Sequence, residues 1–275
     1  MPARHPERIV CLTEESTETL YLLGEERRIV GISGYTVRPP RARREKPRVS
    51  AFLSARTEKI LELKPDLVIG FSDLQADIAR DLAKAGLNVL IFNQRSVQEI
   101  LNMILTLAAL VGAAAKGAEL VQKLEEGLDE VRRCANGFPH RPRVYFEEWD
   151  EPMISGIRWV SELVEIAGGE DLFAEQSHSQ AATGRIISDP DVVVRKNPEV
   201  ILGSWCGKKF RAERVAARPG WRAIAAVREN QLFEVKSADI LQPGPAALTD
   251  GVRQVHEILR RFSSRAGGSR SQAAG

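Results

Sequence analysis

The stretches Lys64-Pro-Asp-Leu-Val-Ile-Gly and Asn197-Pro-Glu-Val-Ile-Leu-Gly share one pattern, and this pattern decides the predicted fold. In each, a polar residue is followed by proline, an acid, three apolar residues and glycine. Proline disfavours a helical conformation for the residue before it, and the apolar run is typical of a strand that is buried on both faces. Because the pattern occurs once in each half of the chain, it predicts two similar α/β lobes.

Around the first stretch, short β-branched runs alternate with helical patterns, as in parallel sheets joined by crossover helices. The expected strands are residues 8–12, 29–33, 66–71 and 88–92, and the expected helices are residues 16–23, 57–63 and 74–85. Residues 1–95 are therefore predicted to form an N-terminal α/β lobe.

The middle of the chain has a different pattern. Residues 96–137 carry apolar side chains at helical spacing with no strand between them, which predicts a helical connector. A second α/β series then predicts a C-terminal lobe over residues 138–262. The Gly-, Ser- and Arg-rich residues 263–275 are predicted to be a disordered tail.

The composition is that of an ordinary folded protein. Apolar residues make up 43% and charged residues 28% of the 275 residues, close to the averages for globular proteins. Lys and Arg outnumber Asp and Glu by only 39 to 37, so we expect no nucleic-acid partner. Neither a P-loop nor a Gly-x-Gly-x-x-Gly motif occurs, and we expect no nucleotide cofactor.

Three cysteines, Cys11, Cys134 and Cys206, are too scattered for a zinc site and predict reduced thiols. The longest apolar stretch, residues 104–115, is far shorter than the ~20 residues that cross a bilayer. The first residues lack the apolar segment of a signal peptide. The sequence as it stands predicts a cytoplasmic protein, and an upstream translation start would make it periplasmic or otherwise extracytoplasmic.

Several short motifs over residues 7–262 together resemble one family, the substrate-binding proteins of ABC importers with a helical backbone between lobes, in particular the vitamin B12 (cobalamin) and ferric-siderophore binders. The carriers are Arg8-Ile-Val-Cys-Leu, Ser16-Thr-Glu-Thr-Leu, Gly31-Ile-Ser-Gly-Tyr, Leu63-Lys-Pro-Asp-Leu-Val-Ile, Trp159-Val-Ser-Glu-Leu-Val-Glu-Ile-Ala-Gly-Gly-Glu-Asp, Pro219-Gly-Trp and Ala226-Val-Arg-Glu-Asn-Gln-Leu-Phe-Glu-Val. The resemblance implies two Rossmann-like α/β lobes with a ligand cleft between them, binding without chemical turnover, and a monomer.

The resemblance also implies aromatic ligand contacts. Where family members hold cobalamin, aromatic side chains from both lobes flank the flat corrin ring. The matching positions are Tyr35, Phe52 and Phe71 in the first lobe and Trp149 and Trp205 in the second. They follow or end expected strands, and ligands of open α/β sheets bind outside the carboxyl ends of the strands.

The loop Trp205-Cys206-Gly207-Lys208-Lys209 is a second candidate. Its indole face and the Lys208 ammonium group suit an acidic or phosphate-bearing ligand, although a solvated loop around a core tryptophan has the same pattern. Cys206 as a thiolate could ligate cobalt or iron, but a lone cysteine is more often a small buried apolar residue. We therefore expect no protein metal site.

Polar residues complete the candidate list. The acids of residues 147–151 predict either an acidic rim that accepts ligand amides or a solvated turn. Asp239 and Gln242 precede the last expected helix, at a position that in the family faces the ligand. Importer-docking members also carry a surface acid on each lobe. Asp77 stands near the first such place, whereas the match around Glu213 is poor, so a permease partner stays open.

The resulting hypothesis is non-catalytic binding of a corrinoid, cobalamin or a precursor, for uptake or intracellular handling, with no catalytic cofactor. The alternative is a ferric siderophore, haem or another metal chelate, since Lys208, Lys209 and Arg211 suit an anionic ligand. A metal-dependent enzyme subunit would need clustered Cys or His ligands, and the scattered cysteines argue against it.

Overall fold

The computed structural model describes residues 5–272, with the backbone alone described for residues 265–272. The chain divides into two compact units. Unit 1 contains the chain up to Gln94 together with Gln98–Leu124 and Gln242–Pro245. Unit 2 contains Arg95–Val97, Glu125–Leu241 and the chain from Ala246 onward. Each unit is an α/β body around its own sheet, which confirms the predicted fold class.

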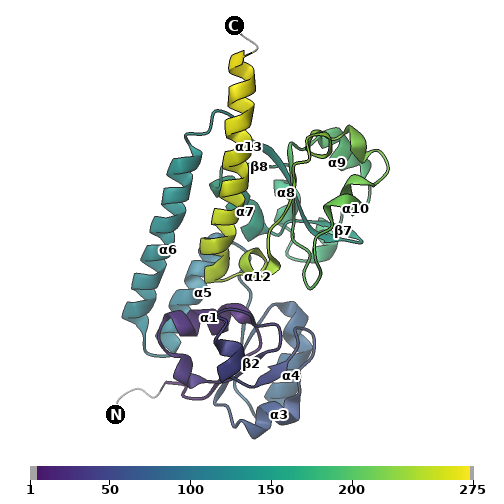
Figure 1. Ribbon diagram of the computed structural model, residues 1–275. Helices are drawn as coiled ribbons and strands as arrows, with labels where there is room; N and C mark the ends of the chain where they lie inside the picture. The colour runs from purple at the N-terminus through teal and green to yellow at the C-terminus, as the bar shows by residue number, and fades with distance from the viewer. Residues whose placement is uncertain (1–4, 273–275) are drawn as a thin grey trace. The chain divides into compact units, whose positions relative to one another are not determined.

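Unit 1 is built on a five-stranded parallel sheet in the order β3-β2-β1-β4-β5. Its strands are β1 Ile9–Cys11, β2 Ile29–Ser33, β3 Arg48–Ser50, β4 Leu67–Phe71 and β5 Val89–Phe92. Its helices are α1 Glu14–Leu22, α2 Ala42–Glu45, α3 Thr57–Glu62, α4 Ala76–Lys84, α5 Val97–Leu110 and the first part of α6 Ala114–Ala135, with 3-10 turns at Glu26–Arg28 and Asp73–Gln75. Figure 1 shows α1, α3 and α4 around this sheet.

Unit 2 has the sheet order β10-β9-β6-β7, with the short β8 also paired to β6. Its strands are β6 Arg143–Asp150, β7 Met153–Ser155, β8 Glu170–Asp171, β9 Val200–Gly203 and β10 Leu232–Glu234. Its helices, beside the last part of α6, are α7 Arg158–Ile166, α8 Ala174–Ser177, α9 Asp191–Lys196, α10 Ala212–Ala216, α11 Ala225–Arg228, α12 Ser237–Ile240 and α13 Val252–Gln272, preceded by a π-helical turn Ala247–Gly251; 3-10 turns lie at Ala182–Arg185 and Trp221–Ala223. In Figure 1, α13 runs beside α7, against which it packs.

The two Pro-acid stretches adopt the same local structure. Lys64 has φ 46° and Asn197 has φ 45°, so both polar residues before proline end their helices in the left-handed conformation. The Asn197 side chain also accepts a hydrogen bond from the backbone N–H of Ala225 at 2.8 Å. The strands that follow, β4 and β9, are buried along their whole length. The repeat therefore correctly predicted both a helix end and a buried strand.

Three differences from the sequence prediction have physical causes. β3 was not expected because it has only three residues and begins with the exposed Arg48. β7 pairs antiparallel with β6 through a tight hairpin that an alternating α/β pattern does not indicate. The tail expected to be disordered from residue 263 instead continues α13 to Gln272, because each added residue of a formed helix gains one hydrogen bond. Residues 273–275 of that tail lie outside the described residues.

The helical patterns of residues 96–137 form α5 and α6 as expected, and unit 1 takes α5 from Gln98 onward and α6 as far as Leu124. The boundaries 1–95, 96–137 and 138–262 themselves remain a prediction. Among the described residues no helix is long and apolar enough to span a membrane.

Candidate ligand-binding site

The carboxyl edge of the unit 1 sheet exposes an unusual group of apolar side chains. Tyr35, two residues beyond β2, is 63% exposed, Leu53, beyond β3, is 67% exposed, and Leu74, beyond β4, is 60% exposed. Phe52, next to Leu53, is half-buried. Exposed apolar groups gathered at one edge of a sheet are typical of a binding surface rather than of a core. We call Tyr35, Phe52, Leu53 and Leu74 the apolar edge.

A buried glutamine holds these loops together. The Gln75 amide donates to the carbonyl oxygen of Phe52 at 2.9 Å, and its side-chain oxygen accepts the N–H of Phe71 at 2.9 Å. A Cβ at Gly70 would lie 2.6 Å from that oxygen. Glycine at position 70 is therefore required for the Gln75 side chain to accept the N–H of Phe71. Phe71, which we expected to contact ligand, is 7% exposed and lies in the core of unit 1 instead. It is a fully apolar ring at the end of a strand that is covered on both faces.

Two buried carboxylates follow β1 at the same edge. Glu14 accepts the backbone N–H of Val37, and Glu15 accepts the Thr13 hydroxyl. The other carboxylate oxygen of each is buried without a hydrogen-bond partner. Burial raises the pKa of Glu14 to about 8 and that of Glu15 to about 7, since loss of hydration disfavours the charged form. Burial therefore favours the protonated form of both side chains, and a protonated carboxyl group can donate a hydrogen bond.

The sequence reasoning missed this carboxylate pair. The signal was present, because two adjacent acids at the end of the first buried strand have no adjacent basic residue. A late segment of the chain packs against Glu15: a Cβ at Gly244 would lie 2.5 Å from the Cβ of Glu15. The same segment is fixed by the side-chain N–H of Gln94, which donates to the carbonyl oxygen of Pro243 at 2.9 Å.

In unit 2 the structure brings three of the predicted residues together. The Lys208 ammonium group lies 4.0 Å from the ring centroid of Trp149 and 5.2 Å from that of Trp205. It also pairs with the Asp150 carboxylate. A cation between two indole rings is held by their negative faces. Trp149 is half-buried, so part of its ring is exposed at this edge beside Lys208.

Trp205 itself is a core residue. It is 2% exposed, packs edge-on against Phe210 with 5.0 Å between ring centroids, and donates its indole N–H to Glu147 at 3.1 Å. The Phe210 ring packs directly against the backbone of Gly203. Any side chain at this position would clash with it, because a Cβ at Gly203 would lie 1.9 Å from the ring. Of the two interpretations of this loop, the structure therefore favours a solvated loop around a core tryptophan.

The acids of β6 are ion-paired inside unit 2 rather than forming a rim. Glu147 is fully buried and accepts hydrogen bonds from Arg218, at 2.5 and 3.0 Å, and from the Tyr145 hydroxyl at 2.9 Å. Glu148 accepts two hydrogen bonds from Arg185, at 2.6 and 3.1 Å. Burial, with the neighbouring Glu147 carboxylate, raises the pKa of Tyr145 well above its ordinary value. A charge-paired network of this kind fixes the end of β6.

The remaining predicted polar residues belong to different units. Asp239 is buried in α12 and accepts a hydrogen bond from Gln254 at 2.7 Å, whereas Gln242 is half-buried in the segment that belongs to unit 1. Cys206 is exposed, and desolvation raises the pKa of its thiol, which makes it a poor thiolate ligand. No group of three or more metal-ligating side chains occurs within the described part of the chain.

The two acids considered for docking are exposed. Asp77 begins α4, with 83% of its side chain accessible, and pairs with Arg80 at 2.7 Å. Glu213 begins α10, with 70% accessible, and approaches Arg211 at 3.6 Å. Each belongs to a different unit, so both units carry a surface acid.

The fold and the edges described above define a class of two-unit α/β proteins with exposed apolar groups at strand ends. The family model described as periplasmic binding protein matches residues 9–238, and the chain belongs to this family. Members of the family are substrate-binding proteins of transport systems.

The relatives are similar over almost the whole chain. An uncharacterized ABC transporter substrate-binding lipoprotein, YvrC, of Bacillus subtilis is 26% identical over 265 residues, covering 93% of this chain and 81% of its own. A vitamin B12-binding protein of Vibrio cholerae is 28% identical over 264 residues, covering 92% and 89%. The crystal structure of the periplasmic vitamin B12 binding protein BtuF of Vibrio cholerae superposes with a TM-score of 0.73 at 26% identity, covering 94% and 98%.

Proposed function

We propose that this protein binds a corrinoid, cobalamin or a precursor, without chemical turnover, and delivers it to an ABC importer. The observation that carries the proposal is the apolar edge, where Tyr35, Leu53 and Leu74 are each more than half exposed. Large apolar faces with a polar tip suit a flat macrocycle that also carries amide groups. The names of the Vibrio cholerae relatives support the same ligand class.

The polar groups at strand ends suit the amides at the rim of such a ligand. Glu14 and Glu15 each keep one buried oxygen without a partner, and a ligand amide that reached this oxygen would satisfy it. Trp149 offers an indole face at the corresponding edge of the unit 2 sheet. The Lys208 side chain, which now lies over that ring, would have to move away for a ligand to contact it. Tyr35, Phe52 and Trp149 are therefore the aromatic contacts that we propose.

An importer partner and an extracytoplasmic location belong to the same proposal. They are supported by the name of the Bacillus subtilis relative, a lipoprotein of an ABC transporter, and by the periplasmic description of BtuF. The exposed acids Asp77 and Glu213 are the docking residues that we propose.

The test is retention of coloured ligands. Purified protein is incubated separately with cyanocobalamin, cobinamide, hemin and a ferric siderophore, then desalted, and its visible spectrum is recorded. We expect a corrinoid spectrum at a ratio near one to one. Retention of hemin or of the ferric siderophore alone would replace the corrinoid by the alternative chelate. Absence of all four spectra would contradict the proposal.

Substitution at the apolar edge tests the site itself. Tyr35→Ala is expected to weaken corrinoid binding by roughly 1–3 kcal/mol, the scale of an exposed aromatic anchor. Leu22→Ala is the matched control, because Leu22 is also more than half exposed but lies at the end of α1. Equal affinity of the two variants, measured by titration, would remove Tyr35 from the site.

A further inference from the structure

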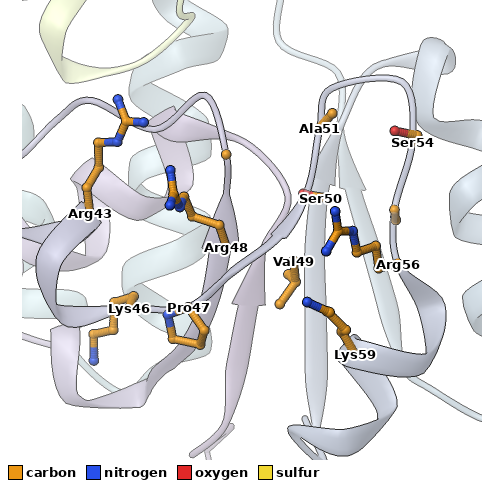
Figure 2. A pocket seen from close by; sticks show the side chains of 12 residues that line it. Arg43, Lys46, Pro47, Arg48, Val49, Ser50, Ala51, Ser54, Arg56 and Lys59 are labelled. Carbon is orange, nitrogen blue, oxygen red and sulfur yellow. The ribbon is translucent and has the colours of Figure 1, made fainter.

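A pocket of about 770 Å³ lies beside β3, the edge strand of the unit 1 sheet. Its walls come from Arg43 in α2, residues 46–51 along β3 with Gly34 beside them, residues 54–56 of the loop before α3, and Lys59 in α3. The volume is in the range of small-molecule sites. Figure 2 shows Arg56 and Lys59 pointing toward Val49, with Arg43 and Arg48 on the opposite wall.

Backbone hydrogen bonds hold these walls in place. The N–H of Gly34 donates to the carbonyl oxygen of Ser50 at 2.7 Å, and the N–H of Arg56 donates to that of Val49 at 3.0 Å. Ser50 and Ala55 also form an isolated antiparallel bridge. The chain therefore folds back on β3, and this return brings Arg56 and Lys59 across from Arg48.

The pocket is strongly cationic. Five of its lining residues are basic, namely Arg43, Lys46, Arg48, Arg56 and Lys59, and none is acidic. Among the side chains described for residues 5–264, no ion pair involves Arg43, Arg48, Arg56 or Lys59. Like charges that converge without counter-charges cost electrostatic energy, which a bound anion would relieve.

Two further groups point to an anion. The Ser50 hydroxyl lines the pocket and its oxygen is buried without a hydrogen-bond partner. Burial lowers the pKa of Lys46, the charge of which would be stabilised by an anion in the pocket. Three arginines supply planar donor pairs that match phosphate or carboxylate oxygens. No aromatic ring lines the pocket on which a nucleobase could stack.

We propose that this pocket is an anion site for a small molecule or headgroup that carries two or more phosphate groups. Five cations in one pocket exceed what a single phosphate needs, and three converging walls favour a compact ligand over an extended peptide. The site lies beside the apolar edge, shares no proposed chelate contact with it, and goes beyond the proposed transport function. A free polyphosphate compound and an anionic lipid headgroup share this chemistry.

The first experiment titrates the whole protein with tripolyphosphate by calorimetry at low ionic strength, with orthophosphate as a comparison. We expect one site, at least tenfold weaker binding of orthophosphate, and loss of affinity as salt rises. A second arm measures sedimentation with vesicles that contain cardiolipin, the headgroup of which carries two phosphates, and with vesicles of phosphatidylcholine alone. Binding of tripolyphosphate alone assigns a free ligand, and additional binding to cardiolipin vesicles assigns a headgroup. Absence of binding in both arms would overturn the proposal.

A matched pair of variants separates a pocket from general positive charge. Arg48→Gln with Arg56→Gln removes two pocket charges, and we expect tripolyphosphate affinity to fall at least tenfold. Arg27→Gln with Lys84→Gln removes the same net charge from exposed positions outside the pocket and should change the affinity less than twofold. Equal losses in both double variants would overturn the proposal. Retained corrinoid or chelate binding by the pocket variant shows that it is folded, and Lys59→Gln alone provides a milder test.

Discussion

Unit 1 and unit 2 both place carboxylates where the first strand of their sheet ends, but they compensate the negative charge differently. In unit 1, Glu14 and Glu15 are buried with one unpartnered oxygen each, and their pKa values rise to about 8 and about 7. In unit 2, Glu147 and Glu148 are paired with Arg218 and with an arginine that is itself only 2% exposed. Burial thus favours protonated carboxyl groups at one edge, whereas arginine guanidinium groups neutralise the carboxylates at the other.

The difference suggests that the carboxyl groups of the two units have different roles. Ion pairs that are fully satisfied fix a structure and leave little for a ligand to add. Protonated acids with free oxygens retain hydrogen-bonding capacity for a ligand. The exposed apolar side chains Tyr35, Leu53 and Leu74 lie at the same edge as these acids. We therefore expect the ion pairs of unit 2 to stabilise its own sheet, and the carboxyl groups of the unit 1 edge to keep the capacity to bind a polar group.

We expect the largest effect from removing the Arg218 guanidinium group, which neutralises the Glu147 carboxylate of unit 2. Arg218→Ala would leave Glu147 buried without its charge partner, and we expect a loss of about 3–5 kcal/mol in stability. All four tryptophans belong to unit 2, so urea unfolding followed by their fluorescence reports on this unit.

Arg222→Ala is the control for this variant, since Arg222 is exposed close by in the chain. It should change stability by less than about 0.5 kcal/mol, as is usual for surface substitutions. If both variants unfold at the urea midpoint of the unchanged protein, Glu147 does not depend on Arg218.

Glu14→Gln tests the proton-neutralised edge. The pKa of Glu14 is raised in the folded state, so the unfolded chain releases this proton first and stability falls as pH rises from about 4.5 to about 8. The amide has no proton to lose, so at about 1.4 kcal/mol per pKa unit we expect the variant to be more stable than the unchanged protein by roughly 4 kcal/mol at pH 8, with little difference at pH 4.5. Thermal unfolding at a series of pH values measures this slope. An identical slope in both proteins would contradict the raised pKa.

Lys208→Ala is expected to have the smallest effect. It removes a cation that contacts the rings of Trp149 and Trp205 and an ion pair with Asp150, together worth about 1 kcal/mol at a partly exposed position. The tryptophan emission spectrum should change as well. Lys209→Ala removes the neighbouring exposed charge and should leave both the emission and the unfolding midpoint unchanged.

The fold was largely predictable because both lobes depend on patterns that have a local cause. The Pro-acid stretches determine a helix end and a buried strand within seven residues, and the structure has both at β4 and β9. β3 escaped prediction because its three residues pair with β2 through contacts that are distant in sequence. A short basic edge strand has no periodicity of its own to detect.

The candidate site was less predictable, because exposure depends on packing partners elsewhere in the chain. Trp205 was expected to contact ligand, with a core tryptophan as the alternative, and it lies in the core, where Gly203 makes room for Phe210 beside it. Leu53 and Leu74 were missed for the opposite reason, since an isolated leucine is ordinarily assigned to a core. Whether Tyr35, Phe52, Trp149, Asp239 and Gln242 contact ligand remains a prediction.

The segment Gln242–Pro245 has a consequence for biosynthesis. It belongs to unit 1, where Gly244 closes over Glu15 and Pro243 accepts the hydrogen bond of Gln94. During translation the sheet of unit 1 leaves the ribosome first, but its last piece is made only after most of unit 2. Unit 1 therefore stays incomplete, with the Glu15 surface uncovered, until residues 242–245 have been synthesised, and a ribosome that stalls within unit 2 leaves both units unfinished.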